Sequence, residues 1–229
     1  MLGTITIVEQ NAEFVVVNKP ANCNFHDEGD IGEGLFNQVK KLVSCQDLYP
    51  VHRLDKITSG LIIFAKTLNC AQQFQQAFTQ HQIEKYYLAV SEHKPKKKQG
   101  LISGDMEKSR RGAWKLVRSQ NKPAITQFFS YHLGAGKRLF LLKPHTGKTH
   151  QIRVALNSIG APILGDPLYN KSSVSDRGYL HAYALKFTLN QQSFQFIQPP
   201  SSGDEFISDA MQEQLSQLKL PWQLNWPKR

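Results

Sequence analysis

Apolar residues along this chain recur with two different periods, which divide it into expected strands and helices. Alternation and short runs rich in β-branched residues predict strands over residues 4–8, 14–17, 61–65, 86–90, 124–133, 138–142 and 180–189. Apolar positions three and four apart predict helices over 35–43 and 69–80. A loop marked by Gly29, Gly32 and Gly34 precedes the first helix.

A third helix is expected after a tight turn at residues 144–148. Thr149 is expected to cap its N-terminus, and Gly160 lies where a C-terminal cap belongs. The apolar positions between them follow the i, i+3, i+4, i+7 spacing of a packed face: Ile152, Ala155, Leu156 and Ile159. The tail, with Trp222 and Trp226 among prolines, is expected to pack back onto the domain.

The order of these elements bears on the fold class. Strands and helices do not alternate regularly, which argues against a doubly wound parallel sheet. We therefore predict an α+β fold, in which helices pack on a mixed sheet. A chain of 229 residues without an internal repeat is typical of one domain, spanning residues 1–229.

Charge changes this picture, because the chain carries a net charge of +10. Eight of those ten net positive charges lie between Lys94 and Lys122, a stretch that shows little apolar periodicity. Lysine and arginine release counterions from a phosphate backbone, so such a segment suits a nucleic-acid partner. A solvated basic loop without a specific ligand is the alternative that charge alone leaves open.

Other classes of site find little support. The three cysteines, Cys23, Cys45 and Cys70, cannot all pair with one another and form no C-x-x-C, which favours a reducing compartment. Cys23 and His26 are three apart, but no second ligand pair is near them, so no metal site is expected. No signal peptide and no membrane-length apolar run is visible, which predicts a cytoplasmic protein.

Nucleotide cofactors are not indicated either. The run Gly147-Lys148-Thr149 matches the end of a phosphate-binding loop motif, but that motif needs a glycine at position 142, which is leucine. No G-x-G-x-x-G occurs, so a dinucleotide cofactor is not expected.

Five ordered segments carry a resemblance to a known family. Residues 52–60, His-Arg-Leu-Asp-Lys-Ile-Thr-Ser-Gly, resemble the H-R-L-D-x-x-T-S-G signature of the RluA-type pseudouridine synthases. Residues 146–153 resemble the family's T-G-[RK]-x-H-Q-[IL]-R segment, which is followed here by Pro162-Ile163-Leu164-Gly165-Asp166. Three shorter segments also match family segments and follow the same order along the chain: Asn18-Lys19-Pro20, Lys85-Tyr86-Tyr87 and Leu180-His181-Ala182. The resemblance spans about residues 5–197.

The resemblance implies a pseudouridine synthase fold with a largely antiparallel central sheet, and an enzyme that isomerises uridine to pseudouridine in ribosomal or transfer RNA without a cofactor or metal. This reaction breaks the N1–C1′ bond, turns the base and rejoins it through C5. The target must be flipped out of its stack. A carboxylate must attack or take a proton. Asp55 fits that role, although alone it would suggest only an Asx-turn before Thr58.

Three further residues take roles that the resemblance implies. Arg153 pairs with Asp55, since an adjacent guanidinium favours the ionised carboxylate. Tyr87 stacks on uracil, or its phenol oxygen acts as the base that removes the C5 proton. Tyr86 and Tyr87 point to opposite faces of the strand, so one of them is expected to be structural, and the register favours Tyr87 for the functional role. Arg53, expected on the same side of an extended segment as Asp55, fills the space left by the flipped nucleotide or contacts the backbone. His52 touches phosphate or merely packs.

Several relatives carry an extra N-terminal module resembling the S4 domain, for which this pattern leaves no room. RNA docking is then expected to use the basic segment 94–122, and a monomer is expected, with no DNA or membrane partner. Two rival functions stay open: a non-catalytic RNA-binding or RNA-folding protein, and a hydrolase that releases free uracil.

Overall fold

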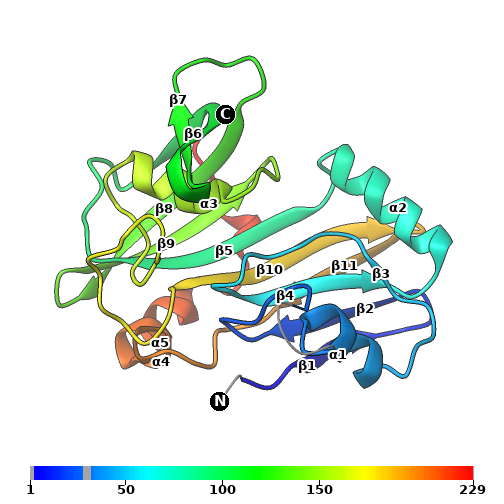
Figure 1. Cartoon of the computed structure of the whole chain (residues 1–229). Helices are drawn as coiled ribbons and strands as arrows, with labels where there is room; N and C mark the ends of the chain where they lie inside the picture. The colour runs from blue at the N-terminus through cyan, green and yellow to red at the C-terminus, as the bar shows by residue number, and fades with distance from the viewer. Residues whose placement is uncertain (1–2, 28–31, 229) are drawn as a thin grey trace. The chain divides into compact units, whose positions relative to one another are not determined.

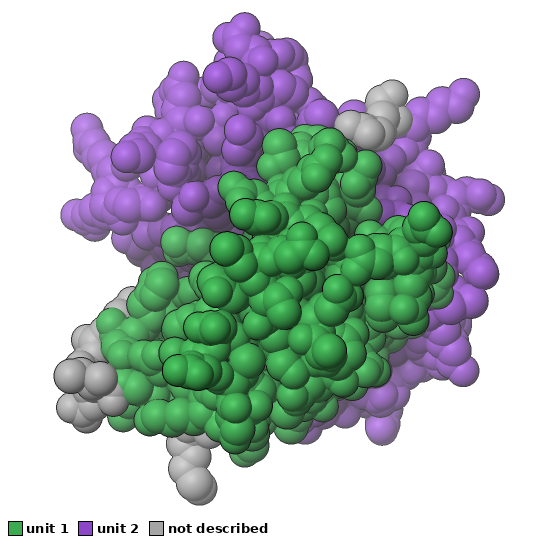
Figure 2. Space-filling view, turned by 90° about the vertical axis from the view of Figure 1, so that its right-hand side faces the viewer, with its two compact units in different colours: residues 1–83, 181–198 green, residues 84–180, 199–229 purple. Residues whose placement is uncertain are grey.

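The computed structural model describes residues 3–27 and 32–228, so Gly29 lies outside the described residues. The chain divides into two compact units (Figure 2). Unit 1 comprises residues 1–83 and 181–198, and unit 2 comprises residues 84–180 and 199–229. Helices flank a mixed, mostly antiparallel set of strands, as Figure 1 shows, which confirms the α+β prediction.

Unit 1 is built on strands in the order β1-β2-β4-β10, with β3 paired to β4 and β11 paired to β10. The register of the β1–β2, β2–β4, β3–β4 and β10–β11 pairs is antiparallel. Its elements are β1 (Thr6–Gln10), β2 (Phe14–Lys19), α1 (Leu35–Leu42), β3 (Tyr49–Pro50), β4 (Thr58–Ala65), α2 (Leu68–Thr79), β10 (Leu180–Leu189) and β11 (Gln192–Ile197).

Every residue of β4 is buried, which explains why residues 61–65 of the strand form a continuous apolar run rather than an alternation. Phe74 of α2 packs edge-on against Phe14 of β2, with ring centroids 5.8 Å apart, and against Phe187 of β10 at 5.3 Å. The apolar side of α2 therefore covers one face of these strands and closes a core around Phe14.

Unit 2 contains the antiparallel strand order β5-β9-β8-β6-β7. Its elements are β5 (Glu84–Ser91), β6 (Gln99–Lys108), β7 (Trp114–Val117), β8 (Ala124–Gly134), β9 (Lys137–Pro144), α3 (Gln151–Ser158), α4 (Asp204–Ile207) and α5 (Asp209–Gln217), with 3-10 turns at Arg110–Gly112 and Pro221–Gln223. The tail packs back as predicted, because the Trp226 ring lies 4.8 Å from Phe129 and 5.7 Å from Tyr86.

One local prediction was wrong, and several elements were missed. No element was predicted in the basic segment, but β6 and β7 form an antiparallel hairpin within it. The N-cap of α3 is His150, in the left-handed region at φ 57°, and not Thr149. No side chain caps this end of the helix; instead the Gln151 side chain closes the preceding turn, because its Oε1 accepts from the Lys148 N–H at 3.0 Å and from the Thr146 hydroxyl at 2.6 Å. The missed elements are β3, β11, α4 and α5.

In the part of the chain that the structure describes, no helix combines the length and the apolar character needed to cross a bilayer.

Candidate active site

Asp55 lies at the start of a tight turn that leads into β4. The Thr58 N–H donates to the Asp55 carbonyl at 3.0 Å, which closes the turn. Leu54 and Ile57 anchor the turn, since each is only 6% exposed, whereas Asp55 is half-buried. Arg53 is exposed, so burial alternates from Arg53 through Leu54 to Asp55, as in the extended segment that the sequence predicted.

Lys19, at the end of β2, holds the backbone of this turn. Its side chain is fully buried, and Nζ donates to the carbonyls of Thr58 at 2.7 Å, Pro20 at 3.1 Å and Lys56 at 3.2 Å. A buried ammonium needs such acceptors, because burying a charge without partners is costly. The sequence analysis identified Asn18-Lys19-Pro20 only as a segment that resembles one in the family. It missed that the lysine of this segment fixes the Asp55 turn.

The residues after the turn are locked by β10 and the end of β11. Ser59 Oγ lies 2.7 Å from His181 Nδ1, and His181 Nε2 lies 2.7 Å from the Gln198 carbonyl oxygen. Because a carbonyl can only accept, Nε2 carries a proton. Gly60 has φ +102°, and a Cβ there would come within 2.3 Å of the Ala182 carbonyl oxygen. The glycine of the motif is therefore required by close backbone approach.

His52 has a structural role within unit 1. Its Nε2 accepts the Ile63 N–H of β4 at 2.9 Å, and its ring lies 5.0 Å from Phe78. Since β3 ends at Pro50, the His52 side chain takes the place of a strand neighbour for β4. Of the two interpretations left open for His52, the structure supports packing.

In unit 2, β5 presents Tyr86 and Tyr87 to opposite faces, as the alternation of a strand requires. Tyr86 is fully buried, its hydroxyl donates to Glu84, and burial raises the pKa of its phenol. Tyr87 is only partly buried. Lys85 shares the Tyr87 face, and burial lowers the pKa of its ammonium group. Tyr86 is thus the structural member of the pair.

Arg153 of α3 is buried and paired with Asp166. Its Nε donates to Oδ2 at 2.7 Å and its Nη2 to Oδ1 at 2.8 Å, while Asp166 is 0% exposed. Asp166 Oδ1 also accepts the N–H groups of Leu168 at 2.9 Å and Tyr169 at 3.1 Å. The plane of the guanidinium is thereby fixed. The sequence placed Asp166 in a matching segment but assigned it no role.

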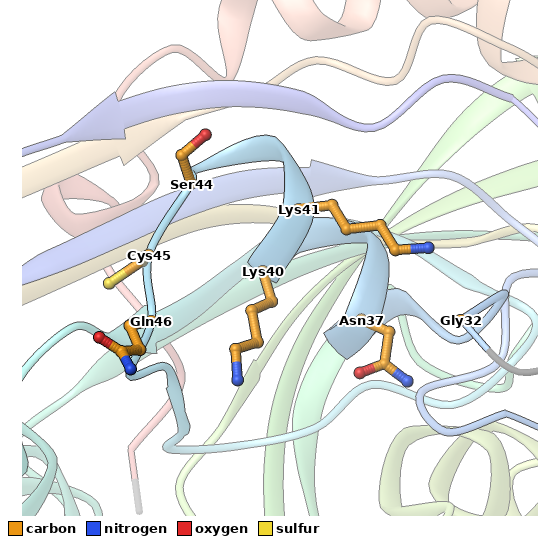
Figure 3. A pocket seen from close by; sticks show the side chains of 7 residues that line it. All are labelled: Gly32, Asn37, Lys40, Lys41, Ser44, Cys45 and Gln46. Carbon is orange, nitrogen blue, oxygen red and sulfur yellow. The ribbon is translucent and has the colours of Figure 1, made fainter.

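A pocket of about 580 Å³ lies elsewhere in unit 1, and it is lined by residues of α1 and its flanking turns: Gly32, Asn37, Lys40, Lys41, Ser44, Cys45 and Gln46 (Figure 3). None of the residues predicted for the active site lines it. The described residues also contain no group of three or more histidine, cysteine, aspartate or glutamate side chains that is arranged to hold a metal.

Residues 13–158, more than half of the chain, match the family model described as RNA pseudouridylate synthase, so the chain belongs to that family. The matched span includes Arg53, Asp55, Tyr87 and Arg153. The RluA-type prediction is confirmed, and the protein is an RNA pseudouridine synthase, which isomerises uridine in RNA.

Related sequences match this chain over most of its length. An RNA pseudouridine synthase of Haemophilus influenzae is 46% identical over 212 residues, covering 92% of this chain and 94% of its own. A protein of Rickettsia bellii named ribosomal large subunit pseudouridine synthase C is 30% identical over 199 residues, covering 84% of this chain and 66% of its own. These matches give no support to a non-catalytic RNA-binding protein.

Solved structures share the fold. Human RNA pseudouridylate synthase domain containing 4 superposes with a TM-score of 0.69 at 26% identity, covering 93% of this chain and 92% of its own. Human RNA pseudouridylate synthase domain containing 1 gives a TM-score of 0.74 at 23% identity, covering 94% and 95%, and shows the fold alone. The predicted pseudouridine synthase fold is thus confirmed.

Proposed function

We propose that Asp55 is the catalytic carboxylate of this isomerisation, in ribosomal or transfer RNA. The observation that carries the proposal is the turn itself: a half-buried carboxylate whose backbone is closed by Thr58 and held by the buried Lys19. A reacting group must be held within a fraction of an ångström of its productive geometry. The hydrogen bonds from Thr58 to Asp55 and from Lys19 to Lys56 and Thr58 hold the backbone of this turn in place.

The proposed reaction needs no co-reactant. The target uridine is flipped out of its stack, the N1–C1′ bond breaks, and the uracil turns within the enzyme. The C5–C1′ bond then forms, C5 loses its proton and N1 gains one, so that all atoms balance. Asp55 serves this chemistry without a cofactor or a metal.

The other roles follow from the family resemblance together with local structure. Tyr87 stacks on uracil, and it is only partly buried, whereas Tyr86 is fully buried. Arg153, held in place by Asp166, acts as a substrate-binding residue. Arg53, exposed at the same turn, assists base flipping.

The wider proposal covers partners and location. One catalytic domain over residues 1–229 docks RNA through the basic segment 94–122 and acts as a cytoplasmic monomer. Neutralising Lys96, Lys97 and Lys98, which are all exposed, is expected to weaken RNA binding and flatten its salt dependence. Binding that is unchanged across a salt series would contradict this part of the proposal.

Nucleoside analysis tests the reaction. RNA from cells lacking the protein, incubated with the enzyme and digested to nucleosides, is expected to gain pseudouridine in proportion to the uridine lost. Release of free uracil would instead identify a glycosidic hydrolase.

A further inference from the structure

The hairpin of β6 and β7 ends in a strongly basic tip. Between Lys108 and Arg118 there are five basic residues and no acidic one. Lys108, Arg110, Arg111, Lys115 and Arg118 are all exposed. One of them, Lys115, pairs with Glu107 on the neighbouring strand at 3.2 Å. We call residues 108–118 the basic hairpin tip.

The tip has a defined conformation. The Ser109 N–H donates to the Ala113 carbonyl at 2.7 Å, and the Ala113 N–H donates to the Arg110 carbonyl at 3.2 Å. Arg111 adopts the left-handed region at φ 57°, which an arginine occupies less readily than glycine or asparagine. A strained position occupied by a charged residue at an exposed tip points to a role for that charge.

One tyrosine joins this tip to the arginine of the active site. The Trp114 N–H donates to the Tyr169 hydroxyl at 2.9 Å. The same hydroxyl lies 3.1 Å from His150 Nδ1, at the N-cap of α3. The guanidinium of Arg153 lies over the Tyr169 ring, with Cζ 5.1 Å from the ring centroid. These residues all belong to unit 2, where β7 contacts α3.

We propose that Tyr169 is a positioning residue that fixes the basic hairpin tip relative to Arg153. The ligand of the tip is the sugar–phosphate backbone of the RNA beside the target uridine. This inference rests on the proposed function. Phosphates bound by Arg110 and Arg111 are then held at a set offset from Arg153, because the hydroxyl of Tyr169 contacts the hairpin and its ring contacts the guanidinium. This fixed distance between the bound phosphates and Arg153 selects which uridine along the RNA is presented for isomerisation.

A double-mutant cycle tests the link. Tyr169→Phe keeps the ring under Arg153 and removes only the hydroxyl. Arg110→Gln with Arg111→Gln removes charge at the tip. Both changes and their combination are assayed for kcat and KM on unfractionated ribosomal and transfer RNA from cells lacking the protein. Dissociation constants for the same RNA are measured over a potassium chloride series.

Neutralising the two arginines is expected to raise KM and the dissociation constant about tenfold and to lower the salt slope. Tyr169→Phe alone should raise both constants severalfold with kcat within about twofold, and should have no effect once the arginines are gone, because coupled residues are not additive. A purely structural tyrosine would instead act equally in both backgrounds. That outcome, or unchanged constants in Tyr169→Phe, would overturn the proposal.

Two controls complete the design. Tyr131→Phe removes a partly buried hydroxyl from β8, outside the network, and is expected to leave all constants unchanged. Lys96→Gln with Lys97→Gln removes charge from the basic segment outside the tip, and Tyr169→Phe should still act in that background. A wild type that isomerises no RNA would refute the proposed function, while the binding cycle would still decide the role of Tyr169.

Discussion

Asp166 holds Arg153 through two parallel hydrogen bonds, of 2.7 Å from Nε and 2.8 Å from Nη2, with both side chains buried. A bidentate pair fixes the plane of the guanidinium as well as its position. Asp166 itself is fixed by the N–H groups of Leu168 and Tyr169. The direction in which Arg153 presents its charge is therefore set by the backbone of residues 166–169.

Asp166→Asn is the change that tests this relationship. The amide can accept only one of the two bonds and leaves a buried guanidinium charge without its counter-charge. Removing one partner of a buried pair costs roughly 3–5 kcal/mol, so a marked loss of unfolding free energy is expected. We expect isomerisation to fall at least tenfold in protein that is still folded. Denaturant unfolding and rate measurements check this, with the exposed Asp47→Asn as the control.

The two tyrosines of β5 are expected to separate stability from activity. Tyr86→Phe removes a buried hydroxyl bonded to Glu84, which should cost about 1 kcal/mol of unfolding free energy with little change in isomerisation. Tyr87→Leu removes an aromatic face and should weaken the binding of the flipped base by about 1–3 kcal/mol. Thermal unfolding and steady-state kinetics on both variants show which tyrosine supports stability and which supports activity. Loss of activity in Tyr86→Phe with none in Tyr87→Leu would reverse the assignment.

Lys19→Met is expected to loosen the Asp55 turn. Methionine fills a similar volume but leaves the carbonyls of Pro20, Lys56 and Thr58 without the ammonium donor. We expect a loss of about 2 kcal/mol or more in unfolding free energy, together with a drop in kcat. Lys66→Met is the matched control, because Lys66 donates to the Asn11 carbonyl at a partly buried position. Similar losses in both variants would argue against a special role for Lys19.

Alkaline pH should destabilise the protein partly through Cys70. Burial, and the nearby charge of Glu13, raise the pKa of the Cys70 thiol to about 11 from 9.0. An acid with a raised folded pKa binds more protons when folded, so unfolding free energy falls as pH rises from about 9 to 11. Cys70→Ala should flatten that slope in denaturant titrations relative to the wild type. An unchanged slope in Cys70→Ala would contradict this assignment.

Much of the fold was predictable because its signals are local. The hairpin of β1 and β2, the helices α1 and α2, and strand β10 all carry their own periodicity. The hairpin of β6 and β7 carries little apolar periodicity, because its strands are polar and partly exposed and depend on pairing with β8. The N-cap of α3 was misplaced because a glutamine side chain within the helix satisfies the turn before it.

The residues of the candidate site divide in the same way, into those that a local sequence pattern reveals and those that depend on tertiary contacts. Asp55, Arg153 and Tyr87 were predicted because they lie in segments that resemble the motifs of the family. Lys19 and Asp166 lie in matching segments, but they act through contacts with distant residues or with backbone groups, so no local pattern reveals their structural roles. A lysine before a proline and an aspartate after a glycine are ordinary in loops. Only tertiary structure distinguishes these two as buried anchors.

Tritium release from RNA labelled at uridine C5 tests the central claim most directly. The RNA comes from cells lacking the protein, and wild type is compared with Asp55→Asn, which keeps the size of the side chain but removes its charge. We predict release by wild type and none by Asp55→Asn, with equal affinity of both proteins for the RNA. Release by Asp55→Asn at the wild-type rate would contradict the assignment of Asp55 as the catalytic carboxylate.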